Sequence, residues 1–149
     1  MTPVVLEIVS PERLLLSRPV EMVVIPAYEG ELGVLPQHAP MIALLRGGTI
    51  RIYENNNHLT NQFFVAGGFA EITPERCTVL ADEAVPISEL NRSVAEERLR
   101  EAEAAFGEVD KNDIAAIDAA MDRIQSARAM LEAAPGGGAP EAGRGQSAT

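Results

Sequence analysis

The placement of proline divides this chain of 149 residues into regions of different fold type. Eight of its ten prolines lie at or before Pro86, and the stretch 87–134 contains none. Proline removes a backbone donor and fixes φ, so it is tolerated at turns and strand edges but disrupts the interior of a helix. The sequence therefore predicts a β domain over 1–86 and a helical region over 87–134. The Gly/Pro-rich stretch 135–149 can bury little apolar surface, and we expect a disordered tail there.

Short aliphatic segments between turn residues fill the first 86 positions. Polar and apolar residues alternate along Thr49–Glu54, as on a half-buried strand, and Asn55–Asn57 follows as a turn that tolerates left-handed backbone. Gly47-Gly48 and Gly67-Gly68 are expected to separate further strands, because glycine adopts positive φ without steric cost. No helical segment lies between the strands, which argues against a parallel α/β sheet. We expect an antiparallel β-sandwich of about ten short strands.

The proline-free stretch predicts two antiparallel helices that form a hairpin, because apolar residues recur at helical spacing and only a short linker divides the segments. Ser88 is expected to cap the first helix and Gly107 to follow its end. Asp110 or Asn112-Asp113 is expected to cap the second helix. The contact between the two helices is rich in alanine and buries little area. The hairpin should therefore be only marginally stable alone and should pack against the sandwich or against a partner.

Charge and motif content exclude several functions. The net charge is −10, with 22 acidic against 12 basic residues, which disfavours nucleic acid and anionic lipid as partners. The single cysteine, Cys77, is expected to be buried and inert, and neither His38 nor His58 has a partner at metal-ligand spacing. No phosphate-binding loop occurs, and no apolar run is long enough to cross a membrane. No catalytic residue, metal or cofactor is predicted.

The segment EGELGVLPQHAP over 29–40 is the most unusual part of the chain. It places two carboxylates, Glu29 and Glu31, in a loop between strands, and it holds two glycines and two prolines. Loops on rigid scaffolds carry function disproportionately, so this acidic loop is a candidate contact for a partner, although a solvated turn has the same composition. A binding or regulatory module is favoured. An adaptor that binds partners through its hairpin, or an enzyme with an acidic cleft at Glu29 and Glu31, are the alternatives.

Several blocks of this sequence, in this order, resemble one family. LEIVSPERLLLSRPVEMVVIPAYEGELGVLPQHAP is followed by LLRGGTIRI and then by FFVAGGFAEITPERCTVLADEA. This order is similar to that of the epsilon subunit of bacterial F-type ATP synthase, over roughly residues 3–134. The resemblance implies a non-catalytic subunit of the rotor's central stalk. It also implies a sandwich bound to the gamma subunit and to the membrane c-ring, at the cytoplasmic face of the bacterial inner membrane, without insertion into the bilayer.

The resemblance also implies roles for individual residues. The loop that holds Glu29, Gly30, Glu31 and Leu32 matches the family's contact with the c-ring. The positions that match the family's gamma-facing residues are Ser10, His38, Ala39 and Pro40.

In the resembled family the hairpin is regulatory, because it can extend into the alpha/beta hexamer and oppose ATP hydrolysis through basic residues. Here the stretch 87–134 holds six basic residues against eleven acidic ones, so weak inhibition is expected. The candidates for that contact are Arg92, Arg98, Arg123 and Arg128. Some relatives bind ATP through a short motif early in the first helix. Ser88, Asn91 and Arg92 stand here at its acidic, arginine and alanine positions, so no tight ATP site is expected.

Overall fold

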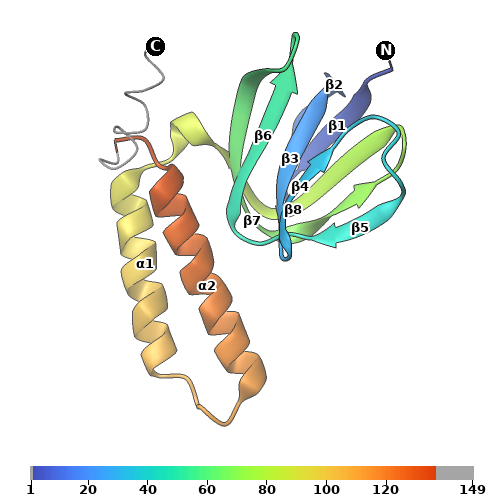
Figure 1. The fold of residues 1–149 in the computed structure, drawn as a ribbon. Helices are drawn as coiled ribbons and strands as arrows, with labels where there is room; N and C mark the ends of the chain where they lie inside the picture. Colours follow the sequence, from blue (N-terminus) through green and yellow to red (C-terminus); the bar gives the residue numbers. More distant parts are fainter. Residues whose placement is uncertain (1, 137–149) are drawn as a thin grey trace. The chain divides into compact units, whose positions relative to one another are not determined.

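The computed structural model describes residues 2–136, which divide into two compact units between Pro86 and Ile87. The first unit is a β-sandwich and the second a helical hairpin (Figure 1). The predicted disordered tail lies outside the described residues from position 137 onward. The strands of the sandwich are β1 (Val4–Val9), β2 (Leu14–Val20), β3 (Met22–Ala27), β4 (Gly30–Val34), β5 (Met41–Leu44), β6 (Gly48–Glu54), β7 (His58–Ile72) and β8 (Arg76–Pro86).

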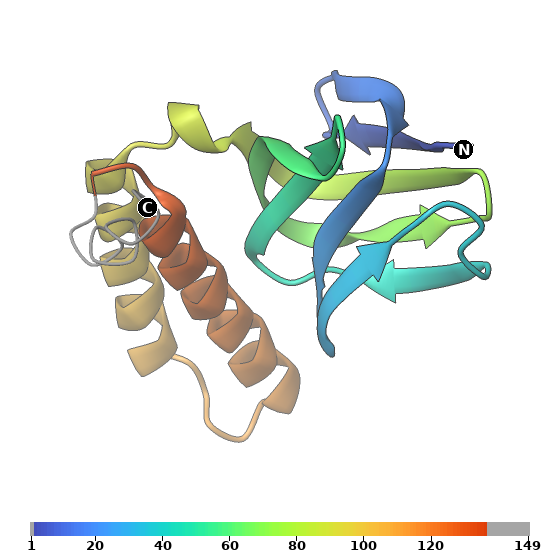
Figure 2. The same ribbon diagram turned by 45° about the horizontal axis from the view of Figure 1, so that its top comes forward.

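The two layers of the sandwich are joined through the long strand β7. Its first part pairs with β6 as far as Val65, and its last part, from Phe69, pairs with β5. The strand order is β2-β1-β8-β7-β6-β3-β4, with β5 attached to β7 (Figures 1 and 2). Gly67 and Gly68 have positive φ and lie inside β7, where we had expected them to separate two strands. The described residues therefore form eight strands rather than about ten.

One pairing in the sheet departs from the antiparallel expectation. β1 runs parallel to β8, with Leu6 opposite Cys77 and Ile8 opposite Val79, whereas the other strand pairs are antiparallel. A parallel pair needs a long connection. Here the connection is the whole of the remaining sandwich, so residues at the two ends of the first unit lie side by side. Because side chains alternate between the two faces with the same period in parallel and antiparallel strands, the sequence pattern does not distinguish the two kinds of pairing.

The core of the sandwich is aliphatic. Along β1 buried and half-buried positions alternate, so that Val4, Leu6 and Ile8 face inward with no exposed area. This alternation is what a strand with one face on a core requires. Cys77 joins the same cluster, as predicted for a buried, inert thiol. The largest other wholly buried members of this cluster are Ile25, Leu45, Ile50, Ile52 and Ile72.

The turns follow two different physical rules. Asn55, Asn56 and Asn57 all have left-handed φ, between 54° and 68°, and they connect β6 to β7 as the sequence predicts. Gly48 does not have positive φ, so the expected reason for a glycine there is wrong. A Cβ at Gly48 would lie 2.7 Å from the Cβ of Pro26, which shows that close approach to β3 requires the absence of a side chain.

The second unit consists of a short 3₁₀ turn (Ile87–Glu89), α1 (Arg92–Gly107) and α2 (Ile114–Ala133). Asn91 caps α1, since its side-chain oxygen accepts the N–H of Val94 at 3.1 Å; the prediction of Ser88 as the cap was wrong, because that residue belongs to the 3₁₀ turn. Asp113 caps α2 in the same way through the N–H of Ala116. Gly107 is the last residue of α1 rather than the residue after it.

Small side chains line the contact between the two helices. Ala95 and Ala102 on α1, and Ala120 and Ala127 on α2, are buried, with Ala95 and Ala120 fully so. Such residues let two helix backbones approach closely, but each buries little area. The loop between the helices is closed by Lys111, whose Nζ donates to the carbonyl oxygens of Phe106 and Val109, both at 3.1 Å.

Candidate functional site

The acidic loop of the sequence forms a tight hairpin turn between β3 and β4. Ala27 pairs with Gly30, so that Tyr28 and Glu29 form the tip, and Gly30 has a φ of 130°, which favours glycine. The N–H of Tyr28 donates to the carbonyl oxygen of Leu44 at 3.0 Å, which ties the tip to the end of β5. Glu29, Gly30, Glu31 and Leu32 therefore lie together at one end of the sandwich, and all except Leu32 are exposed.

Glu31 makes an ion pair that sequence analysis did not anticipate. Its carboxylate accepts two hydrogen bonds from the guanidinium of Arg51 on β6, at 2.6 and 3.1 Å. The Nε of Arg51 also donates to the hydroxyl of Tyr53 at 3.2 Å. Because this bidentate bond favours the charged form, it lowers the pKa of Glu31. The pair bridges β4 and β6 across β3. Only the register of three strands reveals it, since the two residues lie 20 positions apart.

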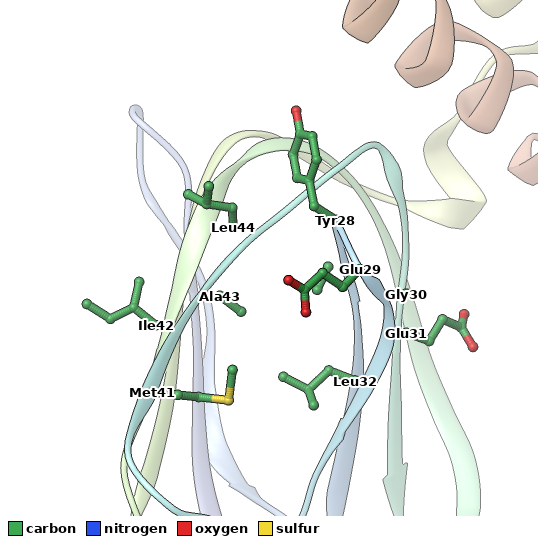
Figure 3. A pocket seen from close by; sticks show the side chains of 10 residues that line it. Tyr28, Glu29, Gly30, Glu31, Leu32, Met41, Ile42, Ala43 and Leu44 are labelled. Carbon is green, nitrogen blue, oxygen red and sulfur yellow. The ribbon is translucent and has the colours of Figure 1, made fainter.

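A groove of about 470 Å³ lies between the β3–β4 hairpin and β5 (Figure 3). In the figure the side chains of Glu29, Leu32 and Met41 turn toward its interior, whereas Glu31 points away from it. This difference follows from the alternation of β4: Leu32 lies opposite the buried Ile25 and packs against the core, and Glu31 lies on the other face. The groove is lined by Ala27, Tyr28, Glu29, Gly30, Glu31, Leu32, Met41, Ile42, Ala43 and Leu44.

The four positions matched to gamma contacts do not form one cluster. Ser10 is 8% exposed, and its backbone and hydroxyl bond to Arg13 across the β1–β2 turn. His38, Ala39 and Pro40 lead into β5 at the other end of the layer, where the N–H of the neighbouring Gln37 donates to Pro74 O at 2.8 Å. The Nδ1 of His38 lies 2.7 Å from the carbonyl oxygen of Ala39.

An apolar stripe, which was missed from sequence, runs across four strands from the end of β5 to the end of β1. Leu44 pairs with Phe69, Phe69 with Leu80, and Leu80 with Val9, which directly precedes Ser10. Paired residues point to the same face of a sheet, so these side chains form a row, of which Leu44 is 64% and Phe69 38% exposed. Ile42, 65% exposed, extends the apolar surface along β5. The unbroken apolar run MIAL of β5 could have revealed this surface. A strand with one solvent-exposed face normally alternates between apolar and polar residues.

The thiol of Cys77 lies in the core of the sandwich. Burial raises the pKa of Cys77 to about 12, so its thiol stays protonated near neutral pH. Within residues 2–136, no group of three or more His, Cys, Asp or Glu side chains is arranged to hold a metal ion. The helices of this part of the chain are also too short or too polar to cross a bilayer.

The hairpin arginines are partly occupied by acidic neighbours within the same unit. The Nε of Arg92 lies 3.4 Å from a carboxylate oxygen of Glu96, one turn further along α1. Arg128 on α2 lies 3.7 Å from Glu103 on α1. Arg98 also has a polar partner, and Arg123 is exposed on α2. The side-chain oxygen of Asn91 caps α1.

Comparison with known proteins agrees with this fold. The family described as "ATP synthase, Delta/Epsilon chain, beta-sandwich domain" matches residues 4–87. The ATP synthase epsilon chain of Granulibacter bethesdensis is 69% identical over 129 residues, which cover 87% of this chain and 95% of that one. The epsilon chain of Gluconacetobacter diazotrophicus is 47% identical over 136 residues, which cover 91% and 96%.

A solved structure shares the fold as well. A chain in the cryo-EM structure of the Euglena gracilis mitochondrial ATP synthase (OSCP/F1/c-ring) superposes with a TM-score of 0.71 at 23% identity. The match covers 89% of this chain and 82% of that one. At this level of identity it shows the fold alone, whereas the sequence relatives above show the family. The chain belongs to the family of epsilon subunits of bacterial F-type ATP synthases.

Proposed function

We propose that the chain is a non-catalytic rotor subunit of the ATP synthase central stalk, which couples rotation of the c-ring to ATP synthesis through gamma. One observation carries the proposal: a single rigid sandwich presents two different contact surfaces at adjoining edges. The β3–β4 tip is acidic and grooved, and the outer row through Leu44, Phe69 and Leu80 is apolar. A subunit that transmits torque needs two such surfaces held rigidly to each other.

The apolar row suits the gamma subunit. Large exposed apolar areas on a soluble domain mark interaction sites, and apolar burial stabilises a permanent interface. The row runs from the turn at Ser10 toward the strand that follows His38, Ala39 and Pro40. Backbone and apolar groups near those positions, rather than the buried hydroxyl of Ser10, would make the contact. The acidic tip with Glu29, Gly30, Glu31 and Leu32 is then left for the c-ring.

The hairpin has at most a weak regulatory role in this proposal. Contact of Arg92, Arg98, Arg123 or Arg128 with an acidic segment of the alpha/beta hexamer would also bring the eleven acidic residues of the hairpin close to that like-charged segment. Arg92 and Arg128 would also have to leave the carboxylates of Glu96 and Glu103, with which they pair. We place the chain at the cytoplasmic face of the inner membrane, as a peripheral member of the complex.

Deletion and add-back test this function. A strain without the chain should make membranes that hydrolyse ATP with little proton pumping, and purified chain should restore pumping and co-purify with gamma. Pumping is followed with a pH-sensitive dye in everted vesicles. A chain that remains a free monomer in extracts, with normal coupling in its absence, would contradict the proposal and favour the adaptor alternative.

A further inference from the structure

The N-terminal hairpin of the sandwich, made of β1 and β2, is joined to the remaining strands by one residue. Glu21 alone separates Val20, the last residue of β2, from Met22, the first residue of β3. One residue is too short for a hairpin connection, since the tightest hairpin loops have two. The chain instead turns a corner at Glu21 and passes from one layer to the other (Figure 2). The β1–β2 hairpin is therefore attached through this single corner.

Glu21 is fastened to the β6–β7 turn by three hydrogen bonds, which we call the corner clasp. Its N–H donates to the carbonyl oxygen of Tyr53 at 3.0 Å. Its carboxylate accepts the N–H of Asn57 at 2.8 Å and that of Asn56 at 3.2 Å. Both asparagines have a φ of 68°, and consecutive N–H groups of such a turn can converge on an anion. These backbone donors, Asn57 first, lower the pKa of Glu21, so its carboxylate is charged near neutral pH.

The other polar contacts of the β1–β2 hairpin lie away from the corner. The guanidinium of Arg18 on β2 donates to Glu54 at 2.6 and 3.0 Å and to Asn61 at 2.6 Å. Glu7 on β1 pairs with Arg76 on β8 at 2.9 Å. Every copy of the chain carries the same partners, so a hairpin that moved to a second copy would regain these contacts. It would not regain the corner clasp, because the chain at the corner would then lead from one molecule to another.

An open β1–β2 hairpin has one kind of surface on which it can close. Without that surface, the buried side chains of Val4, Leu6 and Ile8 and the edge of β8 would face water, which is unfavourable for apolar groups and for an unpaired strand. The surface that fits the hairpin is β8 with the core beside it, either on the same chain or on a second copy. Exchange of an identical element is a low-cost route to dimers, because the contacts of that element are restored.

We propose that the corner clasp keeps the β1–β2 hairpin on its own chain, and that chains without the clasp exchange this hairpin pairwise to form a dimer. The clasp stabilises the closed monomer and is lost when the hairpin is exchanged. Glu21 is thus a positioning residue, which selects the monomer over the exchanged dimer. The inference concerns the chain by itself and does not depend on its role in the rotor.

Glu21→Ala and Arg18→Ala test the clasp, since both remove contacts near the same corner but only the first removes the clasp's carboxylate. The full-length chain and both variants are refolded from urea at about 1 mM, a concentration that competes with closure within one chain. Size-exclusion chromatography with light scattering then separates monomer from dimer. Glu21→Ala should raise the dimer-to-monomer ratio about tenfold, because two monomers then have no carboxylate bonds to lose on exchange.

Arg18→Ala is the matched control. It should unfold at a lower urea concentration and leave the ratio unchanged, because the monomer and the exchanged dimer both contain the contacts of Arg18. Circular dichroism shows whether Glu21→Ala folds. If it does not, Glu21→Gln replaces it, since the amide oxygen still accepts an N–H, and the ratio should rise to a smaller extent. If neither variant folds, the clasp is a requirement of the fold itself and the proposal fails.

A cross-link shows whether the hairpins of such a dimer are exchanged. Arg18→Lys places an amine beside the carboxylate of Glu54, and a carbodiimide joins the two groups as an amide. Lys111→Arg removes the single lysine of the natural sequence. Both changes are added to Glu21→Ala. In an exchanged dimer the link joins two chains, so a denaturing gel should show a covalent dimer, whereas in the monomer the link stays within one chain.

Other results would contradict the proposal. A folded Glu21→Ala chain with the ratio of the unaltered chain would show that the clasp does not restrain the hairpin. An equal rise for Arg18→Ala would assign the dimer to a general loss of stability. A dimer whose chains separate on the denaturing gel, although each carries the internal link, would be held by surface contacts alone.

Discussion

At the scale of single residues, backbone geometry restricts substitution most where strands approach closely. Gly68 lies inside β7 with a φ of 99°, and a Cβ there would fall 2.1 Å from the carbonyl oxygen of Leu80. That neighbour is backbone of the paired strand β8, so it has no rotamer into which it can move. The position where β7 changes partner from β6 to β5 thus depends on the absence of one methyl group.

Gly68→Ala should lower the free energy of unfolding by more than about 2 kcal/mol, because the left-handed φ and the clash with Leu80 both oppose it. Gly33→Ala is the matched control: its Cβ would meet only the Met22 sulfur, at 4.0 Å, and it should change stability by less than about 0.5 kcal/mol. Urea denaturation of both variants measures the difference. Equal stabilities would show that β7 and β8 can separate locally without cost.

The ion pair of Glu31 predicts a small dependence of stability on pH. The pKa of Glu31 is lowered from its ordinary value of 4.5, chiefly by hydrogen bonds from Arg51. A lowered folded-state pKa gives stability that is complete above the unfolded pKa and is lost as pH falls through the folded one. Since the carboxylate is mostly exposed, the contribution is about 0.2–1 kcal/mol.

Glu31→Gln should therefore be slightly less stable than the unaltered chain at about pH 7, and the difference should shrink at an acidic pH below the lowered pKa of Glu31, where the carboxyl is protonated in both the folded and the unfolded chain. Unfolding in urea at the two pH values tests this. Glu75→Gln serves as the control, because it removes an exposed carboxylate elsewhere. If the difference in the free energy of unfolding is the same at both pH values, the charge of the Glu31 carboxylate does not stabilise the fold.

At the scale of elements, the two helices are held by contacts that leave no room for larger side chains. Ala120→Leu should cost about 1–3 kcal/mol, since overpacking a close helix contact forces the backbones apart. Ala119→Leu, at an exposed neighbouring position, should be neutral within about 0.5 kcal/mol. Thermal melts followed by circular dichroism of the helical signal compare the two. If Ala120→Leu melts like Ala119→Leu, the seam is looser than its burial indicates.

The elements of this chain were easier to predict than their pairing. Proline and alternation located β6 and the helical region closely, because these signals act within a few residues. The helix cap was misplaced because Ser88 and Asn91 are both good capping residues, and only the extended backbone at Asn91 decides between them. The parallel contact of β1 with β8 leaves no local signal, and this is also why the antiparallel expectation failed there.

The candidate site shows the same limit. The loop at 29–32 stood out by composition, and the resemblance to epsilon subunits assigned it a role. Glu31 pairs with Arg51 because it lies on the outer face of β4 and because β6 is only one strand away. Glu29, at the tip of the hairpin, turns into the groove instead. Neither fact can be read from the spacing of two glutamates. The groove itself also needs β5, which approaches the tip only through the fold.

At the scale of the whole molecule, the division at Pro86 separates a unit with a continuous aliphatic core from a unit in which mainly alanine side chains are buried. A chain that ends at residue 90 should unfold cooperatively in urea, because it retains all eight strands. A chain that ends at residue 75 should show no cooperative transition, because β1 and β7 both lose β8 as a partner. Cooperative unfolding of the shorter chain would mean that β8 is dispensable to the core.

The parallel pairing of β1 with β8 also has a consequence for synthesis on the ribosome. Glu7 and Thr78 lie 71 positions apart and bond side by side in the finished sheet. At roughly 5–20 residues per second, the nascent first strand waits several seconds for its neighbour. During that interval β1 and β2 expose edges that other nascent chains can occupy. Chaperone occupancy on this messenger should therefore be highest before the β8 codons are translated, and should fall once β8 has emerged.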